Sequence, residues 1–372
     1  MIIAGESSGD FHSALLIQAL KEINPDLNIC GMGGERMRQA GAEILFDIRE
    51  LSIIGFTGVL TNFTKIQRRF NQLLAKIDQL RPEAVILVDY PGFNLKLAKE
   101  VKKRKIPVIY YISPQIWAWW KGRIKQIERS VDKMIVIFKF EQALYQDYGI
   151  NVSFVGHPLL DIAQVTTSKD EFLNKLGLPD QNLTIALMPG SRKMEVERIL
   201  PVLLESARII KEKLPQAQFA VLKAADLPKE IFVAELKKYN LPIVLCENQT
   251  YNLLNASSFA LVASGTATLE TAIMQTPMVV VYKVSFLNWL IAKSLIKVPF
   301  IGLVNVVAGK LIVPEFIQHQ AKPTLIAQCV LEILNNPSSL TNVKNELKAV
   351  REALGTAGAS KRAAAAILEH LS

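Results

Sequence analysis

Short apolar runs alternate with longer amphipathic segments along the first half of the chain. Such runs are typical of strands covered on both faces, whereas Phe11–Ile23 and Phe93–Arg104 repeat apolar residues at helical spacing. The predicted strands are Met1–Ala4, Asn28–Cys30, Ala84–Val88, Val108–Ile112, Met134–Phe138 and Val152–Phe154. Strands that alternate with helices form an open parallel sheet, whose ligands bind at loops after the strands' carboxyl ends.

The strand pattern stops between Gly156 and Lys169, where polar residues accumulate, and a second series of strands and helices then begins. Its predicted strands are Thr184–Met188, Phe219–Leu222, Ile243–Leu245, Phe259–Val262 and Met278–Tyr282, and only helices are expected after them. We therefore predict an α/β protein with two Rossmann-like, doubly wound domains, residues 1–160 and 161–354, that face a central cleft. The sequence leaves open whether a C-terminal helix at about 355–372 packs back on the first domain.

Composition favours an anionic partner. The formal net charge is +9, the pI is about 9.3, and 50% of the residues are hydrophobic, with a mean hydropathy of +0.23. These values favour an acidic membrane surface over nucleic acid, for which the chain has no binding signature. We predict no membrane span and no signal peptide. The cysteines, Cys30, Cys246 and Cys329, are far apart, which predicts free thiols in a reducing cytoplasm.

The stretch Leu261–Tyr282 combines a buried strand, a turn of small residues, a helix and a second buried strand. The residues of the turn that offer open backbone N–H groups are Ser264, Gly265, Thr266, Ala267 and Thr268. Thr266 is the predicted N-cap of the helix, and a helix N-terminus of this kind binds anions. Glu270, one turn into the helix, is suited to accept hydrogen bonds from sugar hydroxyls. The alternative is a well-capped helix in which Glu270 only complements the helix dipole.

A second anion site is predicted after the first strand of the second series. Gly190 and Ser191 let the backbone approach a phosphate, and Arg192 supplies a forked donor. The alternative is a surface arginine paired with Glu195. Because both loops belong to one domain, their coincidence is a more specific signal than either loop alone.

Asp89 follows the buried strand Ala84–Val88 and is therefore expected at the strand's carboxyl end, beside aromatic residues. A carboxyl group held there has a raised pKa and can act as a general base. The alternative, an aspartate that stabilises the turn at Pro91, is compatible with the same position. The loop after the first strand, Gly5–Asp10, allows a tight turn, and Ser8 or Asp10 is expected to cap the helix that follows.

Five other polar residues have two possible roles, in a functional site or in packing. Asn305, Glu315 and Gln318 are polar residues in an apolar context, which suits either a selective pocket or the pairing of buried backbone groups. His12 and His157 have no obvious partner nearby in the sequence, and His157 is expected to stabilise a hinge.

Two apolar segments with basic flanks, Ile53–Leu60 and Phe286–Val298, resemble interfacial helices, with ordinary core helices as the alternative. Aromatic residues in a loop commonly form ligand walls or interface anchors, and three tryptophans share one predicted loop. These are Trp117, Trp119 and Trp120.

Seven motifs, taken in order, resemble those of bacterial lipid-A-disaccharide synthases: GESSGD, DYPGFN, SPQIWAWW, GHPLLD, MPGSR, SGTATLE and GLVNVVAGKLIVPEFIQ. The match runs from Gly5 to about Leu354. The resemblance implies a two-domain glycosyltransferase of the GT-B type at the cytoplasmic face of the inner membrane. It implies that 2,3-diacylglucosamine is transferred with inversion from UDP-2,3-diacylglucosamine to the 6-hydroxyl of 2,3-diacylglucosamine 1-phosphate, which releases UDP.

The resemblance also assigns roles by position, with the acceptor in the first domain and the donor in the second. Asp89 takes the proton of the acceptor hydroxyl, and Arg192, with Gly190 and Ser191, binds the diphosphate. The amides of residues 264–268 hold the same charge, and Glu270 binds the ribose hydroxyls. Weaker donor-site assignments are Asn305, Glu315 and Gln318, and the acceptor side is assigned to Glu6, Ser7, Ser8 and Asp10.

The chain has no Asp-x-Asp motif, so we expect no essential metal and no cofactor. One alternative is another GT-B enzyme that uses UDP-N-acetylglucosamine. The other is a non-catalytic binding protein with two domains. The sequence leaves open the acyl-chain length, the residues that contact acyl chains, and whether the protein forms a homodimer.

Overall fold

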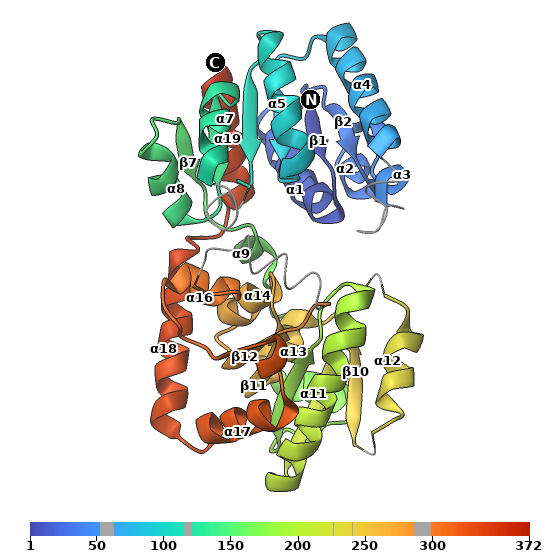
Figure 1. Ribbon diagram of the computed structural model, residues 1–372, viewed down its shortest axis with the longest axis vertical. Coiled ribbons are helices and arrows are strands. Elements are labelled where there is room, and N and C mark those ends of the chain that lie inside the picture. Colours follow the sequence, from blue (N-terminus) through green and yellow to red (C-terminus); the bar gives the residue numbers. More distant parts are fainter. Residues whose placement is uncertain (53–62, 115–120, 226, 240, 286–298) are drawn as a thin grey trace. The chain divides into compact units, whose positions relative to one another are not determined.

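The computed structural model describes residues 1–52, 63–114, 121–225, 227–239, 241–285 and 299–372 (Figure 1). The described chain forms two compact units, each with its own parallel sheet and helices. Unit 1 comprises Met1–Leu160 and Leu354–Ser372, and unit 2 comprises Asp161–Ala353. The prediction of an α/β fold with two parallel sheets is confirmed.

The sheet of unit 1 contains seven described strands in the order β3-β2-β1-β4-β5-β6-β7, and every pairing is parallel. The strands are β1 Ile2–Ala4, β2 Cys30–Gly33, β3 Glu43–Asp47, β4 Val85–Val88, β5 Val108–Tyr111, β6 Lys133–Val136 and β7 Val152–Phe154. The central strands are fully buried because helices cover both faces, as their unbroken apolar sequences require. The sequence analysis missed β3, in which charged residues at both ends leave an apolar run of only three residues.

Helices connect the strands of unit 1. They are α1 Ser7–Ile23, α2 Glu35–Gln39, α3 Arg49–Ser52, α4 Phe63–Leu80, α5 Pro91–Lys103, η2 Lys121–Arg123, α7 Ile124–Ser130 and α8 Lys139–Gln146, followed by α9 Leu159–Ile162 at the boundary with unit 2. The last helix of the chain, α19 Ala359–Leu371, packs against α1 (Figure 1). Arg362 fixes its start, because its Nε donates to the carbonyl of Val155 over 2.8 Å.

The sheet of unit 2 contains six described strands in the order β10-β9-β8-β11-β12-β13, again all parallel. The strands are β8 Leu183–Met188, β9 Ala217–Lys223, β10 Ile243–Glu247, β11 Phe259–Ala263, β12 Met278–Tyr282 and β13 Glu315–Ile317. The helices are α10 Lys169–Lys175, α11 Lys193–Lys213, α12 Lys229–Leu236, α13 Thr250–Ala256, α14 Ala267–Ile273, α16 Leu303–Ala308, η3 Gln318–Gln320, α17 Pro323–Leu334 and α18 Pro337–Ala353.

The expectation that only helices follow Tyr282 is wrong, because β13 pairs in parallel with β12. This strand has three residues and is only partly buried at the sheet edge, so it lacks the apolar run that marks the other strands. Within the described residues, no helix combines the length and apolarity needed to span a bilayer. Three sets of residues singled out in the sequence lie outside the described ranges: the three clustered tryptophans, Ile53–Leu60 and Phe286–Val298.

Candidate active site

Each sheet has one point where its strand order reverses. In unit 1 the chain runs outward from β1 to β3 and then returns to β4, which lies directly beside β1. In unit 2 it runs from β8 to β10 and returns to β11, which lies beside β8. The loops after two such strands turn in opposite directions and leave a crevice at the carboxyl edge, where open α/β sheets bind ligands.

The crevice of unit 1 brings together the loops after β1 and β4. The ring of Tyr90 packs directly on Gly5: a Cβ at Gly5 would lie 2.1 Å from Cδ1 of Tyr90. Only glycine fits there, so the close approach of the two loops depends on this position. The contact places Glu6, the residue before α1, within electrostatic range of Asp89.

The backbone of Asp89 is held in an uncommon conformation. Asp89 and Tyr90 have φ angles of 47° and 49°, in the left-handed region that side chains disfavour. The carbonyl of Asp89 accepts hydrogen bonds from Tyr110 Oη at 2.6 Å and Asn94 Nδ2 at 2.8 Å. Its N–H donates to the carbonyl of Tyr111 at 3.2 Å. Strain of this kind persists only where surrounding contacts enforce it, and it clusters at functional sites.

The environment of Asp89 raises its pKa to about 6. Burial is the main cause, because it disfavours the charged carboxylate, and the negative charge of Glu6 adds to it. The backbone N–H of Tyr90 opposes the shift by stabilising the carboxylate. A carboxylate with this pKa is still mostly ionised at neutral pH and is a stronger base than an ordinary aspartate.

The other residues assigned to the acceptor side fall into two groups. Glu6, Ser7 and Ser8 are exposed at the start of α1, in the loop after β1. Asp10 is buried, and its carboxylate accepts N–H groups of Gly34 at 2.6 Å and of Arg36 and Met37 at 3.2 Å. The expectation that Ser8 or Asp10 caps α1 is wrong: no side chain caps this helix, and Asp10 caps α2 instead.

The crevice of unit 2 is a pocket of about 400 Å³ formed by the loops after β8, β9, β10 and β11. Of the predicted donor-site residues, those that line it are Gly190, Ser191, Arg192, Ser264, Gly265, Thr266, Ala267 and Glu270. The structure thus brings the two loops singled out in the sequence to one place. It does so because β8 and β11 are neighbours in the sheet.

Glu195 organises the loop after β8. Its Oε2 accepts the N–H of Ser191 at 3.0 Å, and Arg192 N lies 3.5 Å away. Gly190 has a φ of 110°, and a Cβ there would lie 2.2 Å from the same oxygen. The carboxylate therefore binds the loop's backbone, and the exposed Arg192 side chain extends from a fixed loop. An anion that approaches these amides competes with Glu195 for them.

The loop after β11 opens α14. Thr266 occupies the N-cap position, as the sequence predicted, but its side chain makes no capping hydrogen bond. The N–H groups of Ser264 and Thr268 already donate to the carbonyls of Val281 and Gly265. The N–H groups of residues 265–267 have no partner among the described residues and are available to an anion. Thr268 differs from its neighbours, because it is fully buried and its Oγ1 donates to the carbonyl of Gly265 at 2.8 Å.

Glu270 contributes a carboxylate to the pocket wall. Tyr251 Oη donates to its Oε1 over 3.0 Å. Burial raises the pKa of Glu270, and the hydrogen bond from Tyr251 lowers it. Tyr251 thus orients the carboxylate through one oxygen, an arrangement suited to accepting hydroxyl hydrogen bonds at the other.

Lys223 is a pocket residue that the sequence analysis missed. It is the last residue of β9 and only 7% exposed, yet it lines the pocket. Its Nζ donates to the carbonyl of Ala224 at 3.2 Å and lies 3.6 Å from Oε2 of Glu247. Its position in the sequence could have identified it, because a lysine directly after the apolar run Phe219–Leu222 lies at the carboxyl edge of the sheet.

Four predicted donor-site residues do not line this pocket: the buried Thr268 and three residues farther along the chain. Asn305 is fully buried, and its Nδ2 donates to Glu315 Oε1 at 2.8 Å and to the carbonyl of Val313 at 2.9 Å. Glu315 also accepts the N–H groups of residues 301 and 302, each at 2.9 Å. Gln318 pairs through its amide with the backbone of Val284. These contacts match the alternative in which polar side chains satisfy buried backbone groups.

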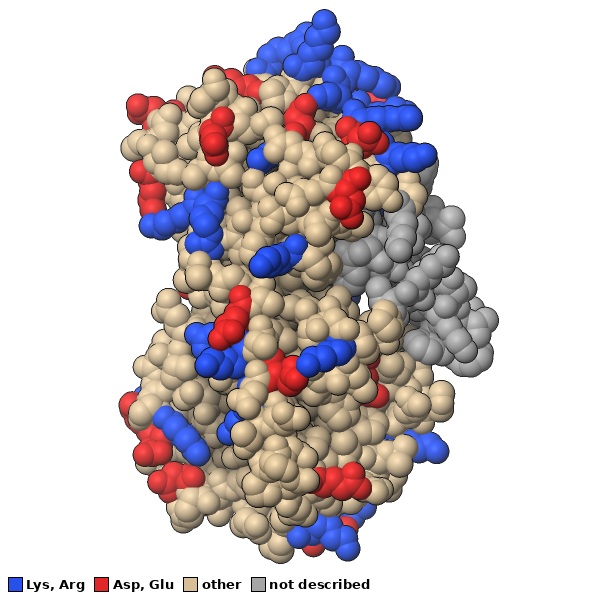
Figure 2. Space-filling view, turned by 90° about the vertical axis from the view of Figure 1, so that its left-hand side faces the viewer, with Lys and Arg blue, Asp and Glu red and all other residues tan. Residues whose placement is uncertain are grey.

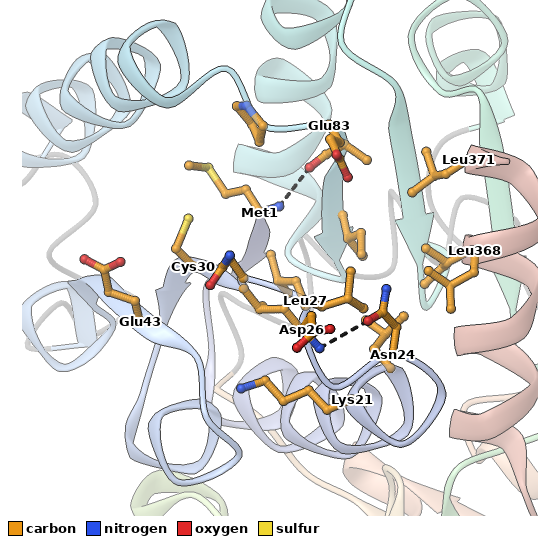
Figure 3. A pocket seen from close by; sticks show the side chains of 18 of the residues that line it. Met1, Lys21, Asn24, Asp26, Leu27, Cys30, Glu43, Glu83, Leu368 and Leu371 are labelled. Atoms are coloured by element: carbon orange, nitrogen blue, oxygen red, sulfur yellow. Dashed lines mark hydrogen bonds between the residues drawn. The ribbon is translucent and has the colours of Figure 1, made fainter.

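A larger pocket of about 750 Å³ lies at the opposite edge of the unit 1 sheet (Figure 3). Met1, at the amino end of β1, lies on its wall together with Lys21, Cys30 and Glu83. Its position at the amino ends of the strands separates it from Asp89, which follows a carboxyl end. Volume alone therefore does not mark the active site.

The two predicted histidines are held away from water. His157 is 4% exposed, and its Nδ1 accepts the N–H of Leu159 at 3.1 Å. Burial lowers the pKa of His157 to about 3 and that of His12 to about 4, so both are neutral at pH 7. His157 thus fixes the backbone turn that leads into α9. Among the described residues, no group of three or more His, Cys, Asp or Glu side chains is arranged to hold a metal ion.

Two doubly wound parallel sheets, each with a polar crevice at its switch point, define the class: the protein has the GT-B fold. The fold is shared with the UDP-GlcNAc 2-epimerase from Neisseria meningitidis, solved bound to UDP-GlcNAc, with a TM-score of 0.67, 14% identity and 99% of each chain covered. It is also shared with the glycotransferase of kitacinnamycin, with a TM-score of 0.65 and 15% identity, over 100% of this chain and 98% of that one.

Sequence comparison then identifies the family. The family profile described as lipid-A-disaccharide synthetase matches residues 1–369. The lipid-A-disaccharide synthase of Syntrophus aciditrophicus is 46% identical, over 98% of this chain and 95% of its own. The lipid-A-disaccharide synthase of Geobacter sulfurreducens is 41% identical, over 100% of this chain and 97% of its own. The chain belongs to the lipid-A-disaccharide synthase family.

Proposed function

We propose that the protein is an inverting glycosyltransferase of lipid A biosynthesis. It transfers 2,3-diacylglucosamine from UDP-2,3-diacylglucosamine to the 6-hydroxyl of 2,3-diacylglucosamine 1-phosphate. The products are a β-1,6-linked disaccharide 1-phosphate and UDP. Family membership supports the reaction class, and the observation that carries the mechanism is the strained, partly buried Asp89 with its raised pKa.

Asp89 is the general base in this proposal. Its carboxylate removes the proton from the acceptor's 6-hydroxyl as that oxygen attacks the anomeric carbon of the donor. Attack from the face opposite UDP inverts the configuration at this carbon. The pKa near 6 fits the task, because the group is ionised at neutral pH and basic enough to share the proton in the transition state.

The pocket of unit 2 holds the UDP moiety in this proposal. Arg192 and the amides at the start of α14 bind the diphosphate, and Lys223 adds a second cation at the same pocket. Charge builds on the diphosphate as the sugar departs, so fixed donors that are already in place stabilise the transition state. Glu270 accepts hydrogen bonds from the ribose hydroxyls.

The substrates carry acyl chains, so the enzyme works at a membrane surface. We propose peripheral attachment to the cytoplasmic face of the inner membrane, which the formal charge of +9 favours because bacterial membranes present anionic lipids.

The direct test is to incubate the purified protein with both lipid substrates and to measure UDP release and the disaccharide product. UDP-N-acetylglucosamine in place of the acylated donor should give no product. Turnover of the non-acylated donor would instead assign the chain to another class of GT-B enzymes. UDP binding without release from the acylated donor would indicate a non-catalytic binding protein.

A further inference from the structure

A basic groove crosses the surface of unit 1 between α4, α5 and α7. Its volume is about 1070 Å³, and its walls carry lysine and arginine side chains over an apolar floor. Figure 2 shows Lys and Arg side chains gathered near the upper end of the view. The wall residues used in the argument are Lys96, Lys99, Lys102, Lys103, Lys125 and Arg129.

The groove has more cations than nearby acids can neutralise. Lys102 pairs with Asp132, and Lys103 pairs with Glu100. Lys96 and Lys99 are exposed on α5 and have no ion-pair partner among the residues that the structure describes. Lys125 and Arg129, one turn apart on α7, have none there either.

This part of the chain also carries most of the protein's net charge. The sequence from Lys96 to Arg129 contains ten basic and two acidic residues, a formal charge of +8 against +9 for the whole chain. Four cations of the groove, Lys96, Lys99, Lys125 and Arg129, have no ion-pair partner in the described ranges, and such a surface attracts an anionic partner over a Debye length of about 8 Å at physiological salt.

The floor of the groove is apolar. Phe70 and Leu74 lie one turn apart on α4, are partly buried, and pack against the hydrophobic core of the unit. The ring of Phe70 packs edge-on against the ring of Phe93, with 5.4 Å between the ring centroids. Phe70 is therefore part of the groove floor and does not project as an aromatic platform on which nucleic-acid bases could stack. Cations around an apolar floor match a phospholipid surface, where phosphates lie above the first methylenes of the acyl chains.

We propose that this groove is the surface through which the protein binds anionic phospholipids. The cations of α5 and α7 contact lipid phosphates, and the Phe70–Leu74 floor receives the apolar region beneath them. Because α5 begins two residues after Asp89, Lys96 and Lys103 lie about 8 and 18 Å along the helix from its start. On the proposed function, bound lipid therefore lies near the acceptor loop.

The test is co-sedimentation with phosphatidylcholine vesicles at low and high salt. One set of vesicles contains no phosphatidylglycerol, and the other contains about 30% of this anionic phospholipid. The groove variant carries Lys96→Ala, Lys99→Ala, Lys125→Ala and Arg129→Ala. The control variant carries Lys169→Ala, Lys213→Ala, Lys344→Ala and Lys348→Ala, four exposed lysines of unit 2 without an ion-pair partner among the described residues. Both variants lose the same formal charge, and circular dichroism checks that both fold.

Each cation near an anionic surface contributes roughly fivefold to the partition coefficient, so the groove variant should bind about a hundredfold or more weakly. The control should change by less than about tenfold, and high salt should release the unmodified protein. The proposal would be overturned if both variants lost vesicle binding equally, or if binding did not depend on phosphatidylglycerol. Tighter binding of the groove to an RNA competitor than to vesicles would also overturn it.

Failure of this proposal is separable from failure of the proposed function, because vesicle binding is measured without substrate. UDP release from substrates presented in detergent micelles should be the same in the groove variant and the unmodified protein. Loss of micellar activity in the groove variant alone would assign these cations to substrate binding and count against a membrane-docking surface.

Discussion

Replacing Asp89 by asparagine removes the proposed base while it keeps the size of the side chain. The carbonyl of residue 89 would still accept from Tyr110 and Asn94, so the strained loop should persist. A positioned general base contributes about 10²–10⁴-fold to a rate, or roughly 3–5 kcal/mol. We expect kcat to fall by that factor while the Kd for UDP stays within about twofold, since Asp89 and the UDP pocket belong to different units.

The dependence of the rate on pH also tests the assignment of Asp89 as the general base, because the folded protein raises the pKa of this carboxyl group. With a pKa of about 6, roughly nine tenths of the Asp89 carboxyl is ionised at pH 7 and about one tenth at pH 5. UDP release by the unmodified enzyme should therefore fall about tenfold across this range, and the remaining activity of Asp89→Asn should lack this acid limb.

Asp10→Asn provides the matched control. This carboxylate is buried in the same unit but caps α2, so its loss should lower stability by about 1–3 kcal/mol and leave the acid limb near pH 6. The base assignment is refuted if Asp89→Asn retains turnover within tenfold of the unmodified enzyme, or if its activity still follows a group with a pKa near 6.

Three further outcomes follow from the described contacts. Glu6→Gln removes a like charge that raises the pKa of Asp89, so the acid limb of the rate profile should move to lower pH; a limb that stays in place contradicts this coupling. Lys223→Met should weaken UDP binding by about tenfold in calorimetry, whereas Lys229→Met, which removes the other cation beside Glu247, should not. Buried His157 has its pKa lowered to about 3, so the unfolded chain takes up more protons below about pH 6.5 and stability is lost as the pH falls towards 3. His157→Asn should abolish about 2 kcal/mol of the loss between pH 7.5 and 5 in urea titrations; an unchanged loss would show that another group is responsible.

The positions of the strands and of the ligand loops could be read from the sequence because their signals are local. Buried strands such as Val85–Val88 and Phe259–Ala263 are apolar throughout, and the turn residues directly after them mark the carboxyl edge. This reasoning located Asp89, Arg192 and the turn before α14. It failed at the edge strands β3 and β13, because charged residues at their ends leave apolar runs of only three and two residues.

Contacts between distant segments were beyond the reach of the same reasoning. Asp10 binds the start of α2, 24 residues or more along the chain, and Glu315 binds the backbone of residues 301 and 302. From the sequence alone, each was an equally plausible ligand group. Whether a polar side chain faces a ligand or a buried amide depends on which backbone groups the fold leaves without a partner.

The sequence by itself determined the two series of strands and the polar residues at their ends, because apolar periodicity and turn chemistry act over a few residues. Its seven ordered motifs carried the resemblance to the family. Only the tertiary structure decided that β8 and β11 are neighbours and that Lys223 lines the pocket beside them. It also decided that Asn305 and Glu315 form hydrogen bonds with backbone groups. The physical reason is that strand order and burial are set by packing across the whole sheet. No local pattern records that packing.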